Sequence, residues 1–322
     1  MDIPQGYKQT ELGIIPDDWE VKRISDFTSI ITGGTPSTLR PEYWGGNIMW
    51  MSSGELNKKF VFDVEGRITT EGLLNSSTHM IPPFCVLIGL AGQGKTRGTA
   101  AYNYISLCTN QSIAAILPND KYDSLYLYYV VDSKYDYLRL LSSGDGGRGG
   151  LNKNLLNSLE IVFPKTIAEQ RAIAEALSDI DGLIAALDKK IAKKRLIKQG
   201  AMQQLLTGKK RLPGFTDSWV EKKLGEILDY EQPQPYLVVS TDYVDSGIPV
   251  LTAGKSRILG YTTEQFGIYN KLPVIIFDDF TTDSKYISYP FKVKSSAMKV
   301  LSLKNNDYDL RLVYELMQQI DF

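Results

Sequence analysis

TIAEQRAIAEALSDIDGLIAALDKKIAKKRLIKQGAMQQLLTG, residues 166–208, is the longest stretch of the chain with a helical pattern. Its apolar residues repeat at alternating steps of four and three, which is the 3.5-residue period of a coiled-coil seam. The seam positions are Ile173, Leu177, Ile180, Ile184, Leu187 and Ile191. Ala and long straight-chain residues fill most other positions, and these residues favour helix. We therefore predict a long spacer helix over residues 165–208 whose seam pairs with another helix or docks another subunit.

Both ends of this helix carry residues that cap helices. Thr166 suits the N-cap, and Glu169 follows three residues later as the partner of a capping box. Gly208 can take the left-handed conformation that closes a helix. A helix from Ile167 to Leu206 would be roughly 60 Å long at 1.5 Å per residue. Such a rod has too few sequence neighbours to bury its seam, so we expect it to pack on another long helix.

The composition is that of an ordinary globular chain. Its 322 residues are enough for two domains, and 43% are hydrophobic and 23% charged. The net charge of -1 gives no overall basicity, so any nucleic-acid surface must be local. Two cysteines, Cys85 and Cys108, suit a reducing compartment, and the single histidine, His79, argues against a histidine-based metal site or a Ser-His-Asp triad. Without a signal peptide or an apolar run of membrane-spanning length, we predict a cytoplasmic protein with no membrane contact.

The segment before the helix, residues 1–164, predicts one mixed α/β domain. Its apolar runs indicate buried strands, and residues 122–141 have helical spacing. Residues 19–27 alternate like a strand or a short helix, and residues 142–150 form a glycine-rich loop. The predicted strands are Asn47–Met51, Cys85–Leu90, Asn103–Cys108 and Ile113–Leu117.

The segment after the helix, residues 209–322, repeats the first domain in the same order. PDDWEVKRISDF around Trp19 matches TDSWVEKKLGEIL around Trp219, and Gly54 matches Gly254. PFCVLIGL matches KLPVIIFDDF, and residues 119–129 match residues 305–315. Few identities in a fixed order indicate a duplicated unit. The second copy lacks counterparts of the glycine-rich loop, the strand after it and a second long helix, so we predict an incomplete second domain.

One motif offers a different function. Gly89–Thr96, GLAGQGKT, satisfies the P-loop pattern and follows a buried strand, which suggests a P-loop ATPase with a coiled-coil arm. A P-loop requires a helix directly after its Lys-Thr pair, so that the helix N-terminus faces the phosphates. The sequence RGTAAYNYISLC follows instead and is rich in strand-forming residues. We therefore prefer a hairpin that places Lys95 and Arg97 on an exposed loop.

Several segments together resemble one family. They are ELGIIPDDWEVKRISDF, the ITGGTPS loop, CVLIGLAGQGKTRGTAAYN with CTNQSIAAILP, and FPKTIAEQRAIAEALSDIDGLI running into KKRLIKQGAMQQLLTGKKRLPGF. The chain is similar in these segments to the specificity (S) subunit of type I DNA restriction-modification systems, C-terminally truncated. The resemblance implies two target-recognition domains joined by a long helix, each recognising one half of a split sequence in double-stranded DNA. It leaves open whether the truncation is natural.

The resemblance also implies partners. Two methyltransferase (M) subunits would dock on the helices, bind S-adenosylmethionine and methylate adenine N6, and a restriction (R) subunit would join for cleavage. This chain would then hold no cofactor and no catalytic site. It has no Asn/Asp-Pro-Pro-Tyr/Phe motif, since its Pro82–Pro83 pair lies in IPPF, and for Asp278, Asp279 and Asp283 a turn role is favoured over a nuclease site. A homodimer through the long helix is a further hypothesis, as is a regulatory chain that binds M subunits without directing methylation.

Candidate DNA contacts are basic or aromatic residues on predicted loops. They are Lys95, Arg97, Arg148, Lys153, Lys255, Arg257, Lys285, Tyr286, Lys292 and Lys294. Asn110 and Gln111 match a family motif, although fixing a turn is the favoured role for them. Residues 189–211 hold nine Lys or Arg residues and no acidic residue. This basic run is either a solvated helix face or a surface that meets a partner or phosphates.

Overall fold

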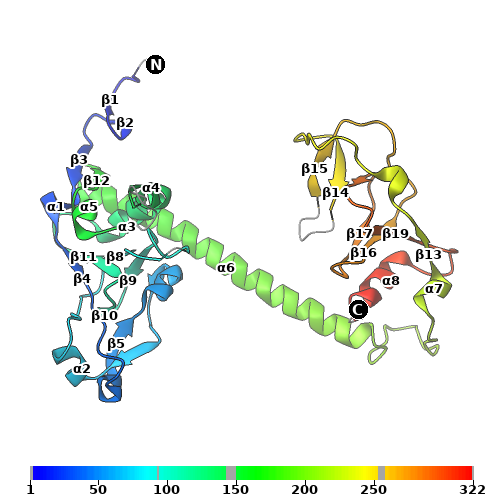
Figure 1. Ribbon diagram of the computed structural model, residues 1–322, viewed down its shortest axis with the longest axis horizontal. Coiled ribbons are helices and arrows are strands. Elements are labelled where there is room, and N and C mark those ends of the chain that lie inside the picture. The colour runs from blue at the N-terminus through cyan, green and yellow to red at the C-terminus, as the bar shows by residue number, and fades with distance from the viewer. Residues whose placement is uncertain (1–2, 93, 143–149, 253–257, 321–322) are drawn as a thin grey trace. The chain divides into compact units, whose positions relative to one another are not determined.

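The computed structural model describes residues 3–92, 94–142, 150–252 and 258–320 (Figure 1). The chain forms two compact units, Met1–Asp188 and Lys189–Phe322. The long helix α6 (Ile167–Leu205) runs from the first unit into the second. The prediction of a long helix is therefore confirmed, whereas the three-part division at residues 164 and 208 stays a prediction.

A five-stranded sheet forms the centre of the first unit. Its strands, in spatial order, are β4 (Ile30–Thr32), β11 (Ile113–Ile116), β8 (Val86–Gly89), β9 (Ala100–Asn103) and β6 (Phe60–Val61). All neighbours are antiparallel except β6 and β9. Strands β8, β9 and β11 are buried along their whole length, because helices cover one face and a second sheet covers the other. The helices on this sheet are α3 (Ser124–Ser133) and α4 (Tyr135–Leu141).

The second sheet of this unit has three strands, with the order β10 (Cys108–Thr109), β5 (Trp44–Met51) and β7 (Gly66–Ile68). Two strand pairs complete the unit, β1 (Tyr7–Thr10) with β2 (Gly13–Pro16) and β3 (Glu20–Arg23) with β12 (Glu160–Phe163). The short helices are α1 (Ile24–Phe27), η1 (Pro41–Tyr43), η2 (Ser53–Lys58), α2 (Thr70–Leu74) and α5 (Lys153–Asn157).

The second unit has two sheets of its own. One has the order β13 (Leu228–Glu231), β19 (Met298–Leu303), β16 (Val274–Asp278) and β17 (Ser284–Ile287). The other has the order β15 (Ile258–Thr262), β14 (Ile248–Leu251) and β18 (Lys292–Val293). Three short helices accompany them, α7 (Leu224–Ile227), η3 (Gln234–Tyr236) and α8 (Leu310–Met317).

The larger sheets of the two units share the order of four strands, and the first unit adds β6 at one edge. Strands β13, β19, β16 and β17 repeat the order and antiparallel directions of β4, β11, β8 and β9. In each small sheet the middle strand has one parallel and one antiparallel neighbour. The predicted duplication is therefore confirmed at the level of strand order.

Local hydrogen bonds repeat as well. Asp123 and Asp309, which the sequence pairs, both cap their helices by accepting a backbone N–H, at 2.9 and 2.7 Å. In α1, Asp26 accepts the N–H of the N-cap residue Arg23 at 2.9 Å, and in α7, Glu226 accepts the N–H of the N-cap residue Lys223 at 2.7 Å. The repeated polar residues thus determine where equivalent helices begin.

Most of the strands and helices predicted for the first unit are present in the structure. The runs at Cys85–Leu90 and Ile113–Leu117 contain β8 and β11, residues 122–141 form α3 and α4, and residues 19–27 form a strand followed by a helix. The predicted strand Asn103–Cys108 is wrong, because β9 ends at Asn103. The Asn103 side chain accepts from Cys85 N at 2.7 Å and donates to Ile105 O at 2.8 Å, which turns the chain away from the sheet.

The predicted N-cap at Thr166 and the predicted left-handed conformation of Gly208 are also confirmed. Thr166 Oγ1 accepts the N–H of Glu169 at 3.2 Å, as an N-cap does. Gly208 follows the helix with a φ of 70°, a conformation that glycine adopts without steric cost. Among the residues described, no helix is long and apolar enough to cross a membrane.

Candidate nucleic-acid interface

A buried glutamine fixes the start of α6 to the first unit. Gln170 is 4% exposed. Its Oε1 accepts the N–H of Asp123 at 2.9 Å, and its Nε2 donates to Pro164 O at 3.0 Å. The neighbouring Glu169 accepts from the indole N–H of Trp19 at 3.3 Å. The sequence around Pro164, Glu169 and Gln170 does not by itself predict this role, which ties the helix to the domain.

The helix seam divides into a covered and an uncovered part. Ile173 packs against the core of the first unit, and its neighbour Ala174 is 1% exposed. The Tyr129 hydroxyl donates to Asp181 at 2.9 Å, so contact with the domain continues for two more turns. The later seam positions are 39–56% exposed, namely Leu177, Ile180, Ile184, Leu187 and Ile191. They form an apolar stripe that stays accessible, and we call it the α6 stripe.

The described residues of the glycine-rich motif, 89–92 and 94–96, connect the two strands of a β-hairpin. Strands β8 and β9 on either side of it are antiparallel, and Gly98 donates its N–H to Gly89 O at 2.9 Å. No helix follows Thr96 in the described part of this segment, so the P-loop alternative is not favoured. Helix α4 stabilises the hairpin, because its Arg139 donates to Gly94 O at 2.7 Å. Lys95 is exposed.

Backbone hydrogen bonds bring two other segments to the base of this hairpin. Leu90 donates its N–H to Ser112 O at 2.8 Å and accepts the N–H of Leu151 at 3.0 Å. The hairpin with Lys95 and the half-buried Arg97 is therefore joined to the loop after β10 and to the start of α5, whose first residue is the exposed Lys153. Three of the predicted basic candidates thus lie on connected loops of one domain.

The loop after β10 presents an amide to solvent. Asn110 Oδ1 accepts the N–H of Ser112 at 3.1 Å, which supports the turn-fixing role predicted for Asn110. Gln111 is exposed and accepts from the Thr35 hydroxyl at 2.6 Å. Thr35 belongs to the ITGGTPS loop, where a Cβ on Gly33 would come within 2.0 Å of Thr109 O. Glycine is therefore needed for this loop to approach the strand that precedes Gln111.

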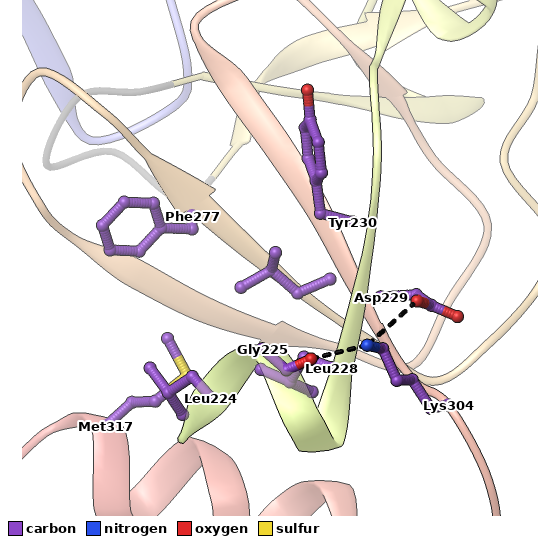
Figure 2. Close-up of a pocket in the computed structure, with 9 residues that line it drawn as sticks. Leu224, Gly225, Leu228, Asp229, Tyr230, Phe277, Lys304 and Met317 are labelled. Carbon is purple, nitrogen blue, oxygen red and sulfur yellow. Dashed lines mark hydrogen bonds and ion pairs between the residues drawn. The ribbon is translucent and has the colours of Figure 1, made fainter.

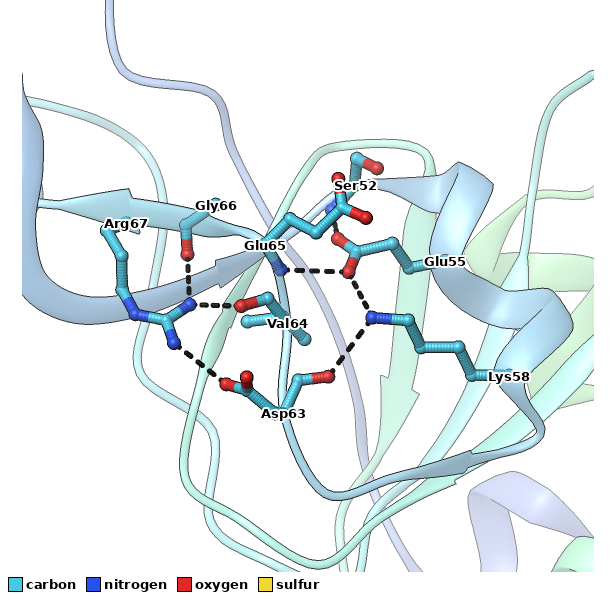
Figure 3. A network of polar contacts seen from close by, with 8 residues as sticks. All are labelled: Ser52, Glu55, Lys58, Asp63, Val64, Glu65, Gly66 and Arg67. Carbon is cyan, nitrogen blue, oxygen red and sulfur yellow. Dashed lines mark hydrogen bonds and ion pairs between the residues drawn. The ribbon is translucent and has the colours of Figure 1, made fainter.

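A polar network fixes the segment that follows β5 (Figure 3). The Glu55 carboxylate accepts the N–H groups of Ser52 and Glu65 at 3.2 and 3.0 Å and the Lys58 ammonium at 2.7 Å. Burial alone would raise the pKa of Glu55, but these donors hold that pKa below its usual value. In the same network Arg67 donates to Asp63 at 2.8 Å. Both cations are thus engaged within the domain.

In the second unit the candidates differ in exposure. Lys294 is exposed, and its N–H donates to Leu251 O at 2.9 Å, which repeats the bond of 3.0 Å from Asn110 N to Met51 O. Lys285 is 13% exposed and donates to Thr252 O at 3.0 Å. The ring of Tyr286 is covered by the guanidinium of Arg311 at 4.8 Å. Lys294 therefore occupies the same loop position as Asn110, whereas Lys285 and Tyr286 are held by their own domain.

The prediction of Lys292 as a surface contact is wrong. Its side chain is fully buried and pairs with Glu264 at 2.6 Å. The ammonium also donates to Phe266 O at 2.7 Å and lies 4.3 Å from the centre of the Phe266 ring. Hydrogen bonds, first of all from Lys292, hold the pKa of Glu264 below its usual value. A buried charge needs such partners, so Lys292 is an internal clamp of the second unit.

Arg148, Lys255 and Arg257 lie outside the described residues. Asp278 accepts the N–H of Phe280 at 2.8 Å, which is the turn role favoured for it. No group of three or more His, Cys, Asp or Glu residues able to hold a metal occurs in the part of the chain that the structure describes.

In the basic run 189–211, Lys198 pairs with Glu315 at 3.4 Å, and most of the other cations are exposed.

The match to a family model settles what kind of chain this is. Residues 16–194 match the type I restriction modification DNA specificity domain. The chain belongs to this family. The matched residues cover nearly all of the first unit and the first two thirds of α6, so the specificity domain includes the Gln170 junction. The resemblance seen in the sequence is thereby confirmed.

Individual relatives of this specificity chain carry the same description. The chain is 53% identical over 117 residues to the EcoR124I/EcoR124II specificity subunit of Escherichia coli, a match that covers 35% of this chain and 28% of that protein. It is 35% identical over 186 residues to the MjaIX specificity subunit of Methanocaldococcus jannaschii, which covers 55% and 41%. The matches thus span less than half the length of these two relatives.

A solved structure extends the likeness to the second unit. The type I restriction-modification S subunit from M. genitalium matches 99% of this chain and 78% of its own, with a TM-score of 0.66 and 17% identity. At that identity the likeness concerns the fold alone. It confirms the predicted fold class, a mixed α/β chain with two recognition-type domains joined by a long helix.

Proposed function

We propose that this chain is the non-catalytic subunit that gives a type I restriction-modification complex its DNA specificity. Each unit recognises one half of a split double-stranded target, and α6 determines the distance between the halves. The observation that carries this proposal is the repeated strand order on one continuous helix of 39 residues. Sites on one face of DNA recur about every 34 Å. A helix of this length, roughly 58 Å at 1.5 Å per residue, is long enough to span that repeat.

The DNA side of the first unit would be its connected loops. Lys95, Arg97 and Lys153 offer cations for phosphates, which position a protein on DNA without reading sequence. Gln111 offers an exposed amide of the type that pairs with adenine in the major groove. In the second unit the equivalent loop offers Lys294, and a lysine suits guanine or a phosphate. The two units would therefore recognise different half-sites.

The partners would use the helix. We assign the α6 stripe to methyltransferase subunits or to the helix of a second copy, because an apolar stripe exposed over several turns is stabilised by burial. S-adenosylmethionine would bind to the methyltransferase partner and not to this chain, and a restriction subunit would join the assembled complex. A cytoplasmic location stays a prediction that accompanies this role.

The proposed role is tested by co-expression with a type I methyltransferase subunit, followed by mapping of methylated adenines. A bipartite motif with two different halves is the expected result. A palindromic motif would mean that two copies each use only the first unit. If the complex forms and no motif is methylated, the chain is a regulatory one and the proposal is refuted.

The α6 stripe has its own test. Leu187→Lys places a charge on the stripe, and Leu196→Lys places the same charge on an exposed position of the opposite helix face. Light scattering of the chain alone would detect a homodimer, and co-purification would detect the methyltransferase complex. Leu187→Lys should weaken at least one of these assemblies, and Leu196→Lys neither. Equal behaviour of both variants would exclude the stripe as a docking surface.

The basic run is tested by salt. Each phosphate contact contributes a slope of roughly 0.9 to the fall of log affinity with log salt. Replacement of Lys193, Lys194 and Arg195 by Gln should therefore lower the slope measured for the complete complex by about two to three, if all three contact phosphates. An unchanged slope would show that this helix face is only solvated.

A further inference from the structure

An apolar groove of about 470 Å³ opens on the second unit, between α7, α8 and the strands β13, β19 and β16 of the larger sheet. Its walls include Leu224, Leu228, Tyr230, Phe277, Leu301 and Met317. Figure 2 shows Tyr230 and Phe277 at opposite sides of this space and Met317 below it. Tyr230 is 58% exposed, although it lies in a strand of the sheet. We call this opening the α7 groove.

In the first unit the residues equivalent to the walls of the α7 groove are buried. The repeated strand registers pair Ile30 with Tyr230 and Ile116 with Leu301, and the repeated capping boxes pair Ile24 with Leu224. These three isoleucines are 0–1% exposed. The same order of four strands is thus accompanied by a closed core in one unit and an open groove in the other.

The segment that seals the first unit is residues 151–163. Helix α5 packs on α1 and β4. Leu156, Leu159 and Ile161 are 0–3% exposed and belong to the same apolar cluster as Ile24 and Ile30. Strand β12 then pairs antiparallel with β3, and Leu159 O accepts the N–H of Ile24 at 3.1 Å. The seal therefore consists of one helical turn followed by one strand.

The second unit has the receiving half of this arrangement. Residues 220–223 correspond to β3 but belong to no sheet of the described residues, and their side chains are exposed. Lys223, the counterpart of Arg23, has the extended backbone that a strand requires. In the first unit Arg23 pairs with Glu160 of the sealing segment at 3.7 Å. An apolar groove beside an unpaired extended segment is the geometry in which proteins bind a peptide by adding a strand.

We propose that the α7 groove binds a peptide segment of a partner protein, built like Leu151–Phe163. One helical turn places a leucine against Leu224 and Tyr230. A strand with alternating apolar residues then pairs antiparallel with residues 220–223 and carries an acidic residue opposite Lys223. A second copy of this chain is a poor source, because its own segment of this kind is buried in its first unit. This inference does not depend on the proposed DNA specificity.

The test uses the full chain and a synthetic peptide with the sequence of residues 150–165, GLNKNLLNSLEIVFPK. A fluorescent label on the peptide reports binding by anisotropy, and hydrogen–deuterium exchange locates it. We expect saturable binding and protection of the backbone amides of residues 220–231. Tyr230→Lys should weaken binding at least tenfold, whereas Val239→Lys, a lysine on another exposed apolar position of this unit, should not. A peptide with Leu156→Asp and Ile161→Asp should not bind.

Three results would overturn the proposal. The first is no binding to a chain that circular dichroism shows to be folded. The second is binding that protects residues 20–32 instead of 220–231, since the peptide would then only replace its own parent segment. The third is protection of residues 220–231 by self-association without peptide, abolished by Tyr230→Lys, which would assign the groove to a second copy.

Discussion

Replacement of Gln170 by alanine should loosen the long helix from the first unit. The side chain is 4% exposed and holds two backbone groups, the N–H of Asp123 and the carbonyl of Pro164. Removing a buried partner leaves each group unsatisfied, at about 1–3 kcal/mol per group. Helix propensity changes little, because Gln and Ala are both good helix formers. We therefore expect a loss of about 2–6 kcal/mol in the free energy of unfolding of the first unit.

Urea unfolding followed by circular dichroism measures this loss, and hydrogen–deuterium exchange locates it. The matched control is Gln203→Ala, which removes an exposed glutamine from the same helix. The Gln170 variant should unfold at lower urea and exchange faster at residues 122–127 and 164–175, while the control should behave like the parent chain. Equal midpoints for the two variants would refute the conclusion that Gln170 joins the helix to the domain.

Three other predictions concern two helix caps, a buried ion pair and a buried thiol. Asp123→Ala and Asp309→Ala each remove a helix N-cap, so each should destabilise only its own unit by about 0.5–2 kcal/mol, measured by exchange in both units. Glu264→Gln should destabilise the second unit because it leaves the Lys292 ammonium buried without its counter-charge, and the added change Lys292→Met should recover most of the stability. Burial raises the pKa of Cys85 from 9.0 to about 12, so the folded chain should not react with a thiol reagent at pH 8. The same shift means that stability is lost as the pH rises from 9.0 towards 12, where the unfolded thiol ionises and the folded one does not.

The features predicted correctly are those that depend on neighbours in sequence. Thr166 and Gly208 mark the ends of α6 because capping uses residues a few positions apart. The hairpin at residues 89–98 could be predicted because the sequence after Thr96 favours a strand. The duplication could be predicted because its repeated residues, such as Asp123 and Asp309, begin equivalent helices.

The errors concern contacts between residues far apart in sequence. Lysine is a residue type usually found at the surface. Lys292 can be buried because its ammonium pairs with Glu264, 28 positions earlier. Asn103 ends a strand because its side chain reaches Cys85 and Pro82, which no local pattern indicates. Gln170 lies on a helix among polar residues. Its hydrogen bond with Asp123, 47 positions earlier, can be recognised only in the folded structure.

The two units combine a common framework with different loop chemistry. Their strand order, helix caps and capping boxes repeat, so the framework is constrained by packing. At the one loop position where Asn110 and Lys294 make the same backbone bond, the side chains differ completely. The Asn110 side chain accepts a hydrogen bond within a turn, and the next residue, Gln111, is exposed to solvent. In the second unit Lys294 itself is exposed. An amide and an ammonium select different base edges. Two equivalent loops with unlike groups are therefore suited to a split target whose halves are not the same.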